Sequence, residues 1–292
     1  MSRDCVIAGY GGLARHMLES CLERYEYVTA MARSAAEDAR HNKNGVEFLS
    51  MDLDEPSSLS ALDVEHKEVF FFVPPSRRDD HDWRMRNFLS AIGSQLPAKI
   101  LYISTTAVYG NSHGELVSEQ SPTTPTTVRG QRRLDAEQQL QEYARRHNVP
   151  IVILRVGGIY GADRLPLRQL ESARPVLLEQ DSGYTNRIHV DDLASICLAA
   201  MARGEGIYNV SDGQPGTMAD YFIALASALD YPVPRRISLQ EARQIMSLEM
   251  MSYLEESRRL DVSRLMNELG VSLKYPDLQA GIRQIIKYRA VR

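Results

Sequence analysis

The sequence predicts an α/β fold: a doubly wound parallel sheet, the Rossmann fold, with a smaller C-terminal α-rich lobe. Three observations predict it. A glycine-rich bend follows the first apolar run, strand-like runs alternate with helical patterns over the first half of the chain, and the runs Val69–Val73 and Ile151–Leu154 are apolar on both faces. Alternation favours a parallel sheet with right-handed crossovers, and fully apolar runs are typical of central strands covered by helices.

The first half of the chain supplies six strands and three clear helices. The strand-like runs are Cys5–Ala8, Tyr27–Met31, Val46–Leu49, Val69–Val73, Ile100–Ser104 and Ile151–Arg155. The clearest helical patterns are Gly12–Tyr25, Asp82–Gln95 and Gly130–His147. The charged run Arg132–Glu137 within the last helix is interpreted as a solvated face, Arg133 excepted.

Beyond Tyr160 the strict alternation stops, which predicts a second lobe. We expect a Rossmann domain from residues 1–162 plus 187–212 and a substrate-binding lobe from residues 163–186 plus 213–292. A strand at Arg187–Val190, a helix at Asp192–Arg203 and a strand at Gly206–Val210 return the chain to the sheet. Further helices are predicted at Met218–Leu229, Leu239–Met246, Val262–Leu269 and Asp277–Tyr288.

The bend after the first strand matches the pattern GxGxxA of dinucleotide-binding turns. Gly9 permits the tight turn, Gly11 lets backbone N–H groups approach a pyrophosphate, and Ala14 fills the third small position. The helix that starts at Gly12 directs its N-terminal dipole toward the anion. An ordinary glycine turn is the alternative interpretation of this bend.

Composition limits the function classes. The 292 residues carry a net charge of −4 and are 43% hydrophobic, which favours a small-molecule partner and disfavours nucleic acid, a membrane surface or disorder. Cys5, Cys21 and Cys197 lie in apolar patterns without metal-ligand spacing, so we expect buried thiols, no disulfide and no metal. We also expect no signal peptide, no membrane span and a cytoplasmic protein.

Six motifs follow one another along the chain. They are Gly9-Tyr-Gly11-Gly12, Met51-Asp52-Leu53, Ile103–Gly110, Leu154–Gly161, Arg187–Ala194 and Tyr208–Asp212. In this order they resemble the extended short-chain dehydrogenase/reductase superfamily, the NAD-dependent epimerase/dehydratase group, over nearly the whole chain. The resemblance implies a Rossmann domain, a C-terminal substrate lobe and an NAD(P) cofactor. Helices Asp82–Gln95 and Gly130–His147 would form the dimer interface if the protein is a homodimer; a monomer fits equally well.

The residues at the end of the second predicted strand indicate whether the chain prefers NADP(H) or NAD(H). Arg33 lies about 20 residues beyond the glycine bend, where it can bind a ribose 2′-phosphate with help from Ser34, so NADP(H) is favoured over NAD(H). A plain surface arginine is the alternative, and Arg15 is a second basic candidate. The resemblance implies that Asp52 and Leu53 flank the adenine, although Asp52 also suits a helix cap. The other expected cofactor contacts are Gly12, Leu13, Ala14, Val73, Pro74, Pro75, Ser104, Val156 and Gly157.

The family's catalytic Tyr, with a Lys four residues later, is missing. Its positions fall at Arg129 and Arg133, and an arginine stays protonated because its pKa exceeds ~12. These arginines either stabilise negative charge or are exposed helix charges. Thr105 aligns with the catalytic Ser/Thr. Tyr109, which is also typical of a packing residue, and the nearby His113 are the candidate proton carriers.

Two functions remain open from the sequence. One is an NADP(H)-binding oxidoreductase or epimerase that acts on a small carbonyl, hydroxyl or sugar substrate; the other is a catalytically silent dinucleotide-binding sensor. Arg187 lies two residues before His189, whereas nucleotide-sugar epimerases commonly have their phosphate-binding arginine four before, which disfavours a sugar nucleotide. Ser257-Arg258-Arg259 either closes over an anionic substrate or is solvated charge.

Overall fold

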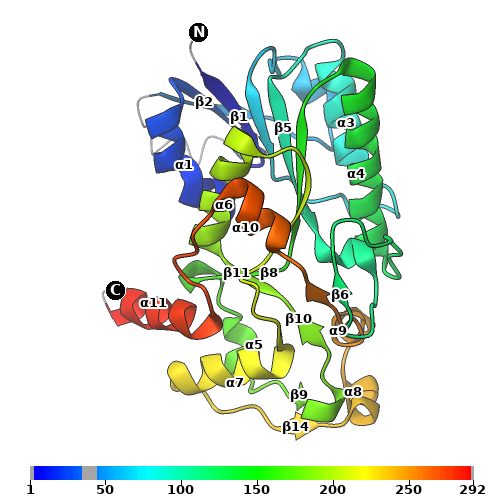
Figure 1. Ribbon diagram of the computed structural model, residues 1–292, viewed down its shortest axis with the longest axis vertical. Helices are drawn as coiled ribbons and strands as arrows, with labels where there is room; N and C mark the ends of the chain where they lie inside the picture. The colour runs from blue at the N-terminus through cyan, green and yellow to red at the C-terminus, as the bar shows by residue number, and fades with distance from the viewer. Residues whose placement is uncertain (1–2, 35–44, 291–292) are drawn as a thin grey trace.

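The computed structural model describes residues 3–34 and 45–290, and its large sheet contains seven parallel strands. Their bounds are β1 Asp4–Ala8, β2 Tyr27–Ala32, β3 Val46–Ser50, β4 Glu68–Phe71, β5 Lys99–Thr105, β7 Ile151–Val156 and β12 Gly206–Val210. The strand order is β12-β7-β5-β4-β1-β2-β3, so the chain winds outward in both directions from the β1–β4 pair (Figure 1). The predicted fold class is confirmed.

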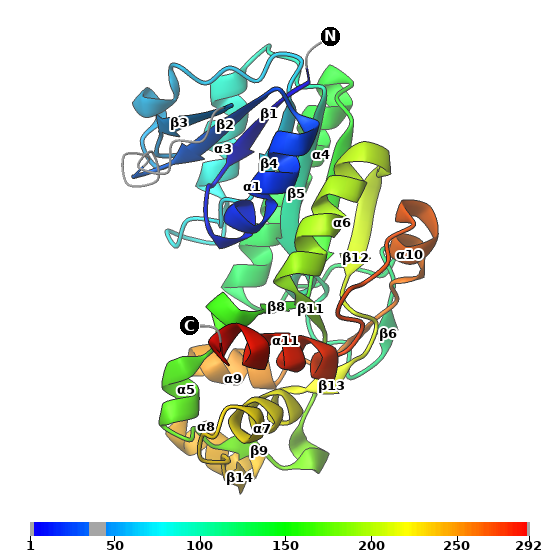
Figure 2. The same cartoon turned by 90° about the vertical axis from the view of Figure 1, so that its left-hand side faces the viewer.

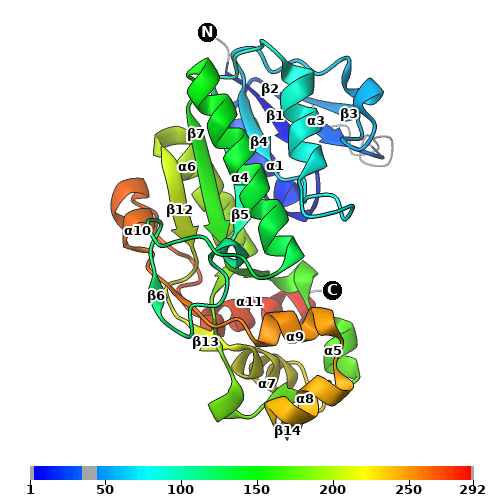
Figure 3. The same cartoon turned by 90° about the vertical axis from the view of Figure 1, so that its right-hand side faces the viewer.

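Helices cover both faces of this sheet. α1 (Gly12–Arg24) and α6 (Val190–Arg203) lie on one face, as Figure 2 shows. α3 (Trp83–Ile92) and α4 (Val128–His147) lie on the other (Figure 3). Local sequence fixes where α3 begins, because the Asp82 carboxylate accepts hydrogen bonds from the amides of Arg84 and Met85. The central strands are buried on both faces, as their apolar composition predicts.

The C-terminal lobe lies beyond the carboxyl edge of the sheet, in the lower half of Figure 1. Its helices are α5 (Leu167–Glu171), α7 (Met218–Ala228), α8 (Leu239–Ile245), α9 (Leu248–Leu254) and α11 (Leu278–Ala290). The other described strands form four short pairs: β8 (Gly158–Tyr160) with β11 (Arg187–His189), β9 (Val176–Leu177) with β14 (Arg236–Ile237), β10 (Tyr184–Thr185) with β13 (Gly216–Thr217), and β6 (Leu116–Val117) with β15 (Arg259–Leu260). Single turns of 3-10 helix are η2 (Pro56–Leu59), η3 (Thr106–Tyr109), η4 (Ala162–Arg164) and η5 (Glu179–Asp181).

Residues of the expected lobe also reach the sheet domain. The helix α10 (Ser263–Leu269) packs its buried Leu265 and Leu269 into the same core as α1 and α6. The domain boundaries drawn from the sequence therefore stay a prediction. Within the described ranges, none of the helices is both long and apolar enough to span a bilayer.

Several elements differ from the sequence prediction. The strand β11, expected to return the chain to the large sheet, pairs with β8 in a separate two-stranded sheet, and the short helix α5 lies where loops were expected. The expected strand Val69–Val73 ends at Phe71, three residues before Pro74, which has no N–H to offer a sheet. The helix α9 was not predicted, because seven residues are too few to show a helical period. Ser247 caps it by accepting a hydrogen bond from the Met250 amide, only two residues after α8 ends.

One interpretation of the charged run in α4 is wrong. Glu137 is fully buried, and its carboxylate binds the Arg155 guanidinium of β7 at 2.7 Å between Oε2 and Nη2. The Ser104 hydroxyl of β5 donates to the other oxygen at 2.5 Å. This buried ion pair holds α4 against β5 and β7, so Glu137 faces the core although its place in the charged run resembles a solvated helix face.

We expect Glu137→Ala to lower the free energy of unfolding by about 3–5 kcal/mol, because it leaves the Arg155 guanidinium buried without a counter-charge. Urea denaturation followed by circular dichroism measures the change. Glu142→Ala on the same helix is the control, since Glu142 pairs with Arg145 and Arg146 at the exposed surface. Equal midpoints for the two variants would show that the buried pair does not hold α4 in place.

Candidate functional site

The carboxyl ends of β1 to β4 surround a cavity of about 250 Å³, here called the strand-end cavity. It lies where the strand order reverses, the usual place for a ligand in a doubly wound sheet. Its lining includes seven of the predicted cofactor residues: Gly9, Gly11, Arg33, Asp52, Leu53, Val73 and Pro74. Residues far apart in the sequence thus meet at one edge of the sheet.

Gly9 is required by the close approach of two strand ends. Its φ is +94°, and a Cβ there would lie 2.9 Å from the Val73 backbone nitrogen. Gly11 precedes α1 without any side-chain cap, which leaves the first amides of the helix available to an anion. Leu13 and Ala14 are buried on the other side of α1 and pack in the core.

Arg33, Ser34 and Asp52, three predicted cofactor residues with polar side chains, follow the carboxyl ends of β2 and β3. Arg33 and Ser34 are exposed at the end of β2. The Asp52 carboxylate accepts from the Asp54 amide at 2.9 Å, and Glu55 rather than Asp52 occupies the N-cap position of the following 3-10 turn, without a side-chain hydrogen bond to it. Pro75 is half-buried directly beyond Pro74.

Arg84 is a cavity residue that the sequence did not indicate. It comes from α3, forms an ion pair with both carboxylate oxygens of Asp54, and donates to the Pro74 carbonyl at 3.0 Å. The pairing with Arg84 lowers the pKa of Asp54. Because the contact joins residues 30 positions apart, no local motif predicts it.

A second cavity of about 280 Å³, the central cavity, lies between the carboxyl ends of β5 and β7 and the lobe. Thr105, Arg129, Val156 and Gly157 line it as predicted site residues. Thr105 stands at the end of β5, and its hydroxyl accepts from the Ala107 amide at 3.3 Å. The remaining polar lining comes from Thr106, Tyr160, Tyr184, Thr185, Asn186, Arg187, Tyr221, Tyr253, Glu256 and Arg258.

Three other predicted residues are engaged outside this cavity. Ser104 is bound to Glu137, as described above. The buried Tyr109 hydroxyl donates to Asn209 at 2.7 Å, and burial raises its pKa. Arg133 donates to the Ile103 carbonyl at 2.9 Å and to the Tyr102 hydroxyl at 3.1 Å. The alternative proton carrier His113 is exposed in its loop.

Arg129 pairs with a carboxylate from the C-terminal part of the chain. Its guanidinium lies 3.3 Å from Glu256 and 3.6 Å from the centre of the Tyr253 ring. Glu256 also binds Arg258 at 2.5 Å through the same oxygen, Oε2. Its second oxygen, Oε1, is buried and has no hydrogen-bond partner within the described ranges. Sequence reasoning missed Glu256, because a lone acid beside Arg258 carries no signal of burial.

Arg187 brings a buried positive charge to the central cavity. It is 7% exposed, and among the residues that the structure describes no carboxylate lies within ion-pair distance. It donates to the Thr217 carbonyl at 3.0 Å, and burial lowers its pKa although Tyr221 and Asp212 act the other way. An anion in the cavity would supply the missing counter-charge.

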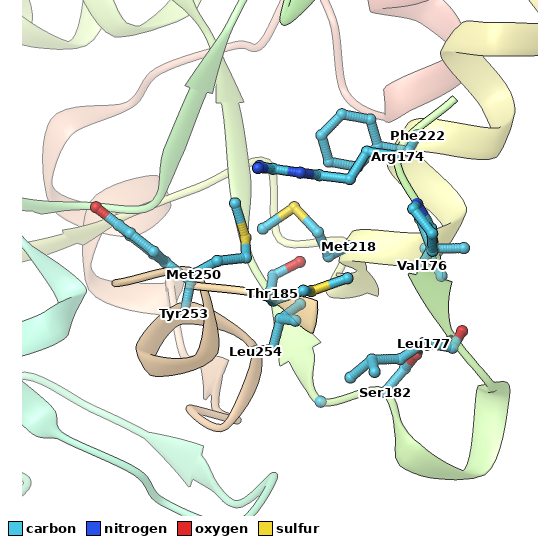
Figure 4. Close-up of a pocket in the computed structure, with 14 residues that line it drawn as sticks. Arg174, Val176, Leu177, Ser182, Thr185, Met218, Phe222, Met250, Tyr253 and Leu254 are labelled. Carbon is cyan, nitrogen blue, oxygen red and sulfur yellow. Dashed lines mark hydrogen bonds between the residues drawn. The ribbon is translucent and has the colours of Figure 1, made fainter. Parts of the chain in front are cut away.

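An apolar pocket continues from the central cavity into the lobe, sharing Thr185, Met218 and Tyr253 with it. We call it the lobe pocket. Its other lining residues are Arg174, Pro175, Val176, Leu177, Ser182, Gly183, Ala219, Phe222, Met246, Met250 and Leu254. Figure 4 shows the Arg174 side chain extending beside the ring of Phe222, above Met218. Unbranched methionine side chains adapt easily to apolar groups of different shape.

The described residues contain no cluster of three or more His, Cys, Asp or Glu side chains that could hold a metal ion. Of the Ser257-Arg258-Arg259 segment, Arg258 is buried at the central cavity and donates to the Gly110 carbonyl at 2.9 Å. Arg259 donates to the Gly114 carbonyl at 2.8 Å, away from the cavity lining.

Known proteins resemble this chain in sequence over much of its length. The model of the NAD dependent epimerase/dehydratase family matches residues 5–211. The Escherichia coli K12 protein YeeZ is 29% identical over 194 residues, covering 64% of this chain and 62% of YeeZ. Mouse dTDP-D-glucose 4,6-dehydratase is 30% identical over 122 residues, which cover 38% of this chain and 34% of that enzyme. The chain thus spans about three fifths of the length of YeeZ.

Solved structures share the fold over almost the full chain. A conserved protein of unknown function from Silicibacter pomeroyi has a TM-score of 0.81 at 28% identity, covering 98% of this chain and 99% of that one. A UDP-glucose 4-epimerase from Thermotoga maritima, solved with UDP-glucose, has a TM-score of 0.79 at 16% identity and covers 99% of both chains. A UDP-glucose 4-epimerase from Thermus thermophilus, in complex with NAD, has a TM-score of 0.77 at 23% identity and covers 98% of both.

The buried carboxyl of Asp212, near Arg187, predicts a pH effect on stability. Burial raises its pKa to about 6, although the Gln214 amide and Arg187 oppose the shift. Between about pH 4 and 6 the native state therefore holds a proton that the unfolded chain has lost, so stability falls as pH rises through this window. We expect Asp212→Asn to be stabilised relative to the unmodified chain at about pH 8, with the difference fading toward about pH 4 in urea titrations.

Asp220→Asn is the control with the opposite sign. Burial acts to raise the pKa of Asp220, but hydrogen bonds from the Thr217 hydroxyl and amide outweigh it and the pKa is lowered. Its carboxylate contributes stability that is lost only as pH falls, so this variant is weaker at about pH 8. Parallel pH profiles for the two variants would contradict the assignment of the raised pKa to Asp212.

Proposed function

Because the chain belongs to the NAD dependent epimerase/dehydratase family, we propose that it is an oxidoreductase that binds NADP(H) and acts on a small anionic substrate with a carbonyl or hydroxyl group. The main support for the proposal is the position of the two cavities. The strand-end cavity with Arg33 and the central cavity with Thr105 both lie at the carboxyl edge of the sheet. A bound dinucleotide supplies or accepts the hydride.

The strand-end cavity suits the adenosine half of a dinucleotide. The free amides at the start of α1 would bind the pyrophosphate, and Asp52 and Leu53 would flank the adenine. Val156 and Gly157, in the central cavity, would contact the nicotinamide half. The absence of a Cβ at Gly9 keeps β1 and β4 close enough to form this cradle.

NADP(H) is our proposed cofactor because β2 ends at Ala32 and is followed by Arg33 and Ser34, without a carboxylate for a free ribose 2′-hydroxyl. Arg33 lines the strand-end cavity, and its guanidinium matches a 2′-phosphate in charge. The Thermus epimerase was solved with NAD, so this preference would distinguish the present chain from that relative.

Among the described residues, the lining of the central cavity contains one carboxylate, that of Glu256. We assign Glu256 as the group that takes the hydroxyl proton of an alcohol substrate and returns it in the reverse direction. Arg129 and Arg258 bind its Oε2 and fix the side chain. Thr105 orients the substrate oxygen. Arg187 binds the anionic group of the substrate.

The lobe pocket indicates what else the substrate carries. Its methionine, phenylalanine, leucine and valine walls offer few hydrogen-bond partners to the hydroxyls of a sugar, which would be costly to bury there. The Thermotoga epimerase was solved with UDP-glucose. In the present chain the pocket favours an anion with an apolar side group, such as a branched or linear 2-oxo acid. The sensor hypothesis is not favoured, because a silent protein has no use for a carboxylate and a guanidinium in a second cavity.

Arg33→Ala tests the cofactor assignment. We expect it to weaken NADPH binding about tenfold, which corresponds to about 1.4 kcal/mol, and to leave NADH binding unchanged. Fluorescence titration measures both constants, with Arg146→Ala on the exposed face of α4 as the control. Tighter binding of NADH than of NADPH by the unmodified protein would show that the NADP(H) assignment is wrong.

Glu256→Gln tests the chemistry. We expect NADPH binding to persist and turnover of 2-oxo acids, with side chains from methyl to hexyl, to fall at least a hundredfold, because the amide keeps the shape but cannot carry the proton. Stopped-flow absorbance of NADPH measures turnover across this series. Glu255→Gln is the matched control, since the neighbouring Glu255 pairs with Arg243 at the surface. If both variants keep full activity, Glu256 is not the proton carrier.

A further inference from the structure

The turn after β8 brings a second cation to the start of α1. This turn is η4, and its last residue, Arg164, is 152 positions beyond Gly12 in the sequence. A Cβ built on Gly12 would lie 2.7 Å from a terminal nitrogen of the Arg164 guanidinium. The guanidinium therefore rests directly on the first residue of α1, and a side chain at position 12 would push it away.

Arg164 lacks a counter-charge among the described residues. Its Nε is buried without a hydrogen-bond partner, and within residues 3–34 and 45–290 no carboxylate lies within ion-pair distance of its guanidinium. The adjacent Asp163 is turned to His16 of α1, 3.2 Å away. A partly buried guanidinium without a partner costs free energy, which an anion at the same place would recover.

The start of α1 and the Arg164 guanidinium lie side by side. The amides of α1 are uncapped at Gly11, and Arg164 lies against Gly12 beside them. We propose that Arg164 is a side-chain ligand of the dinucleotide pyrophosphate, adding a charged, planar set of donors to the backbone amides of the glycine bend. This inference rests on the proposed function, because it requires that a dinucleotide binds in the strand-end cavity.

The assignment has a structural consequence. Arg164 leads directly into α5 of the lobe, and His16 bridges the same turn, through Asp163, to Asp191 at the start of α6. Binding of a pyrophosphate by Arg164 would fix this turn against α1. The cofactor would thereby order the segment that joins the sheet to the lobe.

Arg164→Gln is the test, measured by calorimetry with NADPH, NADH and adenosine 2′-monophosphate. We expect both dinucleotides to bind about tenfold more weakly or worse, and the monophosphate, which has no pyrophosphate, to bind as before. Arg168→Gln, an exposed arginine on α5, is the matched control and is expected to change nothing. Arg164→Lys keeps the charge but not the planar donor pair, and is expected to recover part of the affinity.

The outcomes separate this inference from the proposed function. If the unmodified protein binds neither dinucleotide, the proposed function fails. If it binds NADPH and Arg164→Gln binds it equally well, the role of Arg164 fails and the proposed function stands. Weaker binding of all three ligands would also overturn the assignment, because it would show a general loss of charge or of folding. If the melting temperature falls in Arg164→Gln but not in Arg164→Lys, the lysine variant becomes the test. An unchanged affinity of that variant for NADH would then overturn the assignment.

Discussion

The close approach of β1 and β4 is the constraint on which the rest of the site depends. These two strands are neighbours although the chain passes through β2 and β3 between them, and their carboxyl ends are the point where the sheet reverses its winding. Only a residue without a Cβ fits at Gly9 against the Val73 backbone. The strand-end cavity and the free helix terminus at Gly11 both follow from this single contact.

The charge distribution of the site differs from that of the whole chain. The protein carries a net charge of −4, yet each cavity at the carboxyl edge of the sheet presents an arginine without a carboxylate partner in the described ranges: Arg33 in the strand-end cavity and Arg187 in the central one. Other arginines, such as Arg84 and Arg155, are neutralised by ion pairs and hold elements together. The unpaired guanidiniums therefore mark places for anions of a ligand, whereas the paired ones belong to the scaffold.

The parts of the fold and site that the sequence predicts are the local ones. Each strand of the large sheet is a short apolar run, and Gly9, Arg33 and Thr105 sit at or just beyond the ends of such runs, so their common edge follows from parallel pairing alone. Glu137, Arg84 and Glu256 could not be placed this way. Their burial depends on partners from other elements, and a charged residue on a helix shows the same pattern whether it faces water or a buried guanidinium.

The proposed role of Glu256 depends on Arg129, which the resemblance to the family places at the position of the catalytic tyrosine. Arg129 stacks on Tyr253 and pairs with Glu256. A tyrosine at 129 could offer Glu256 one neutral hydrogen bond but no counter-charge, which would leave the buried carboxylate dependent on Arg258 alone. Conversely, a carboxylate is what makes a guanidinium at 129 tolerable in a partly buried cavity wall. On the proposed assignment, the proton-carrying group lies in the segment after α9, and Arg129 of α4 positions it.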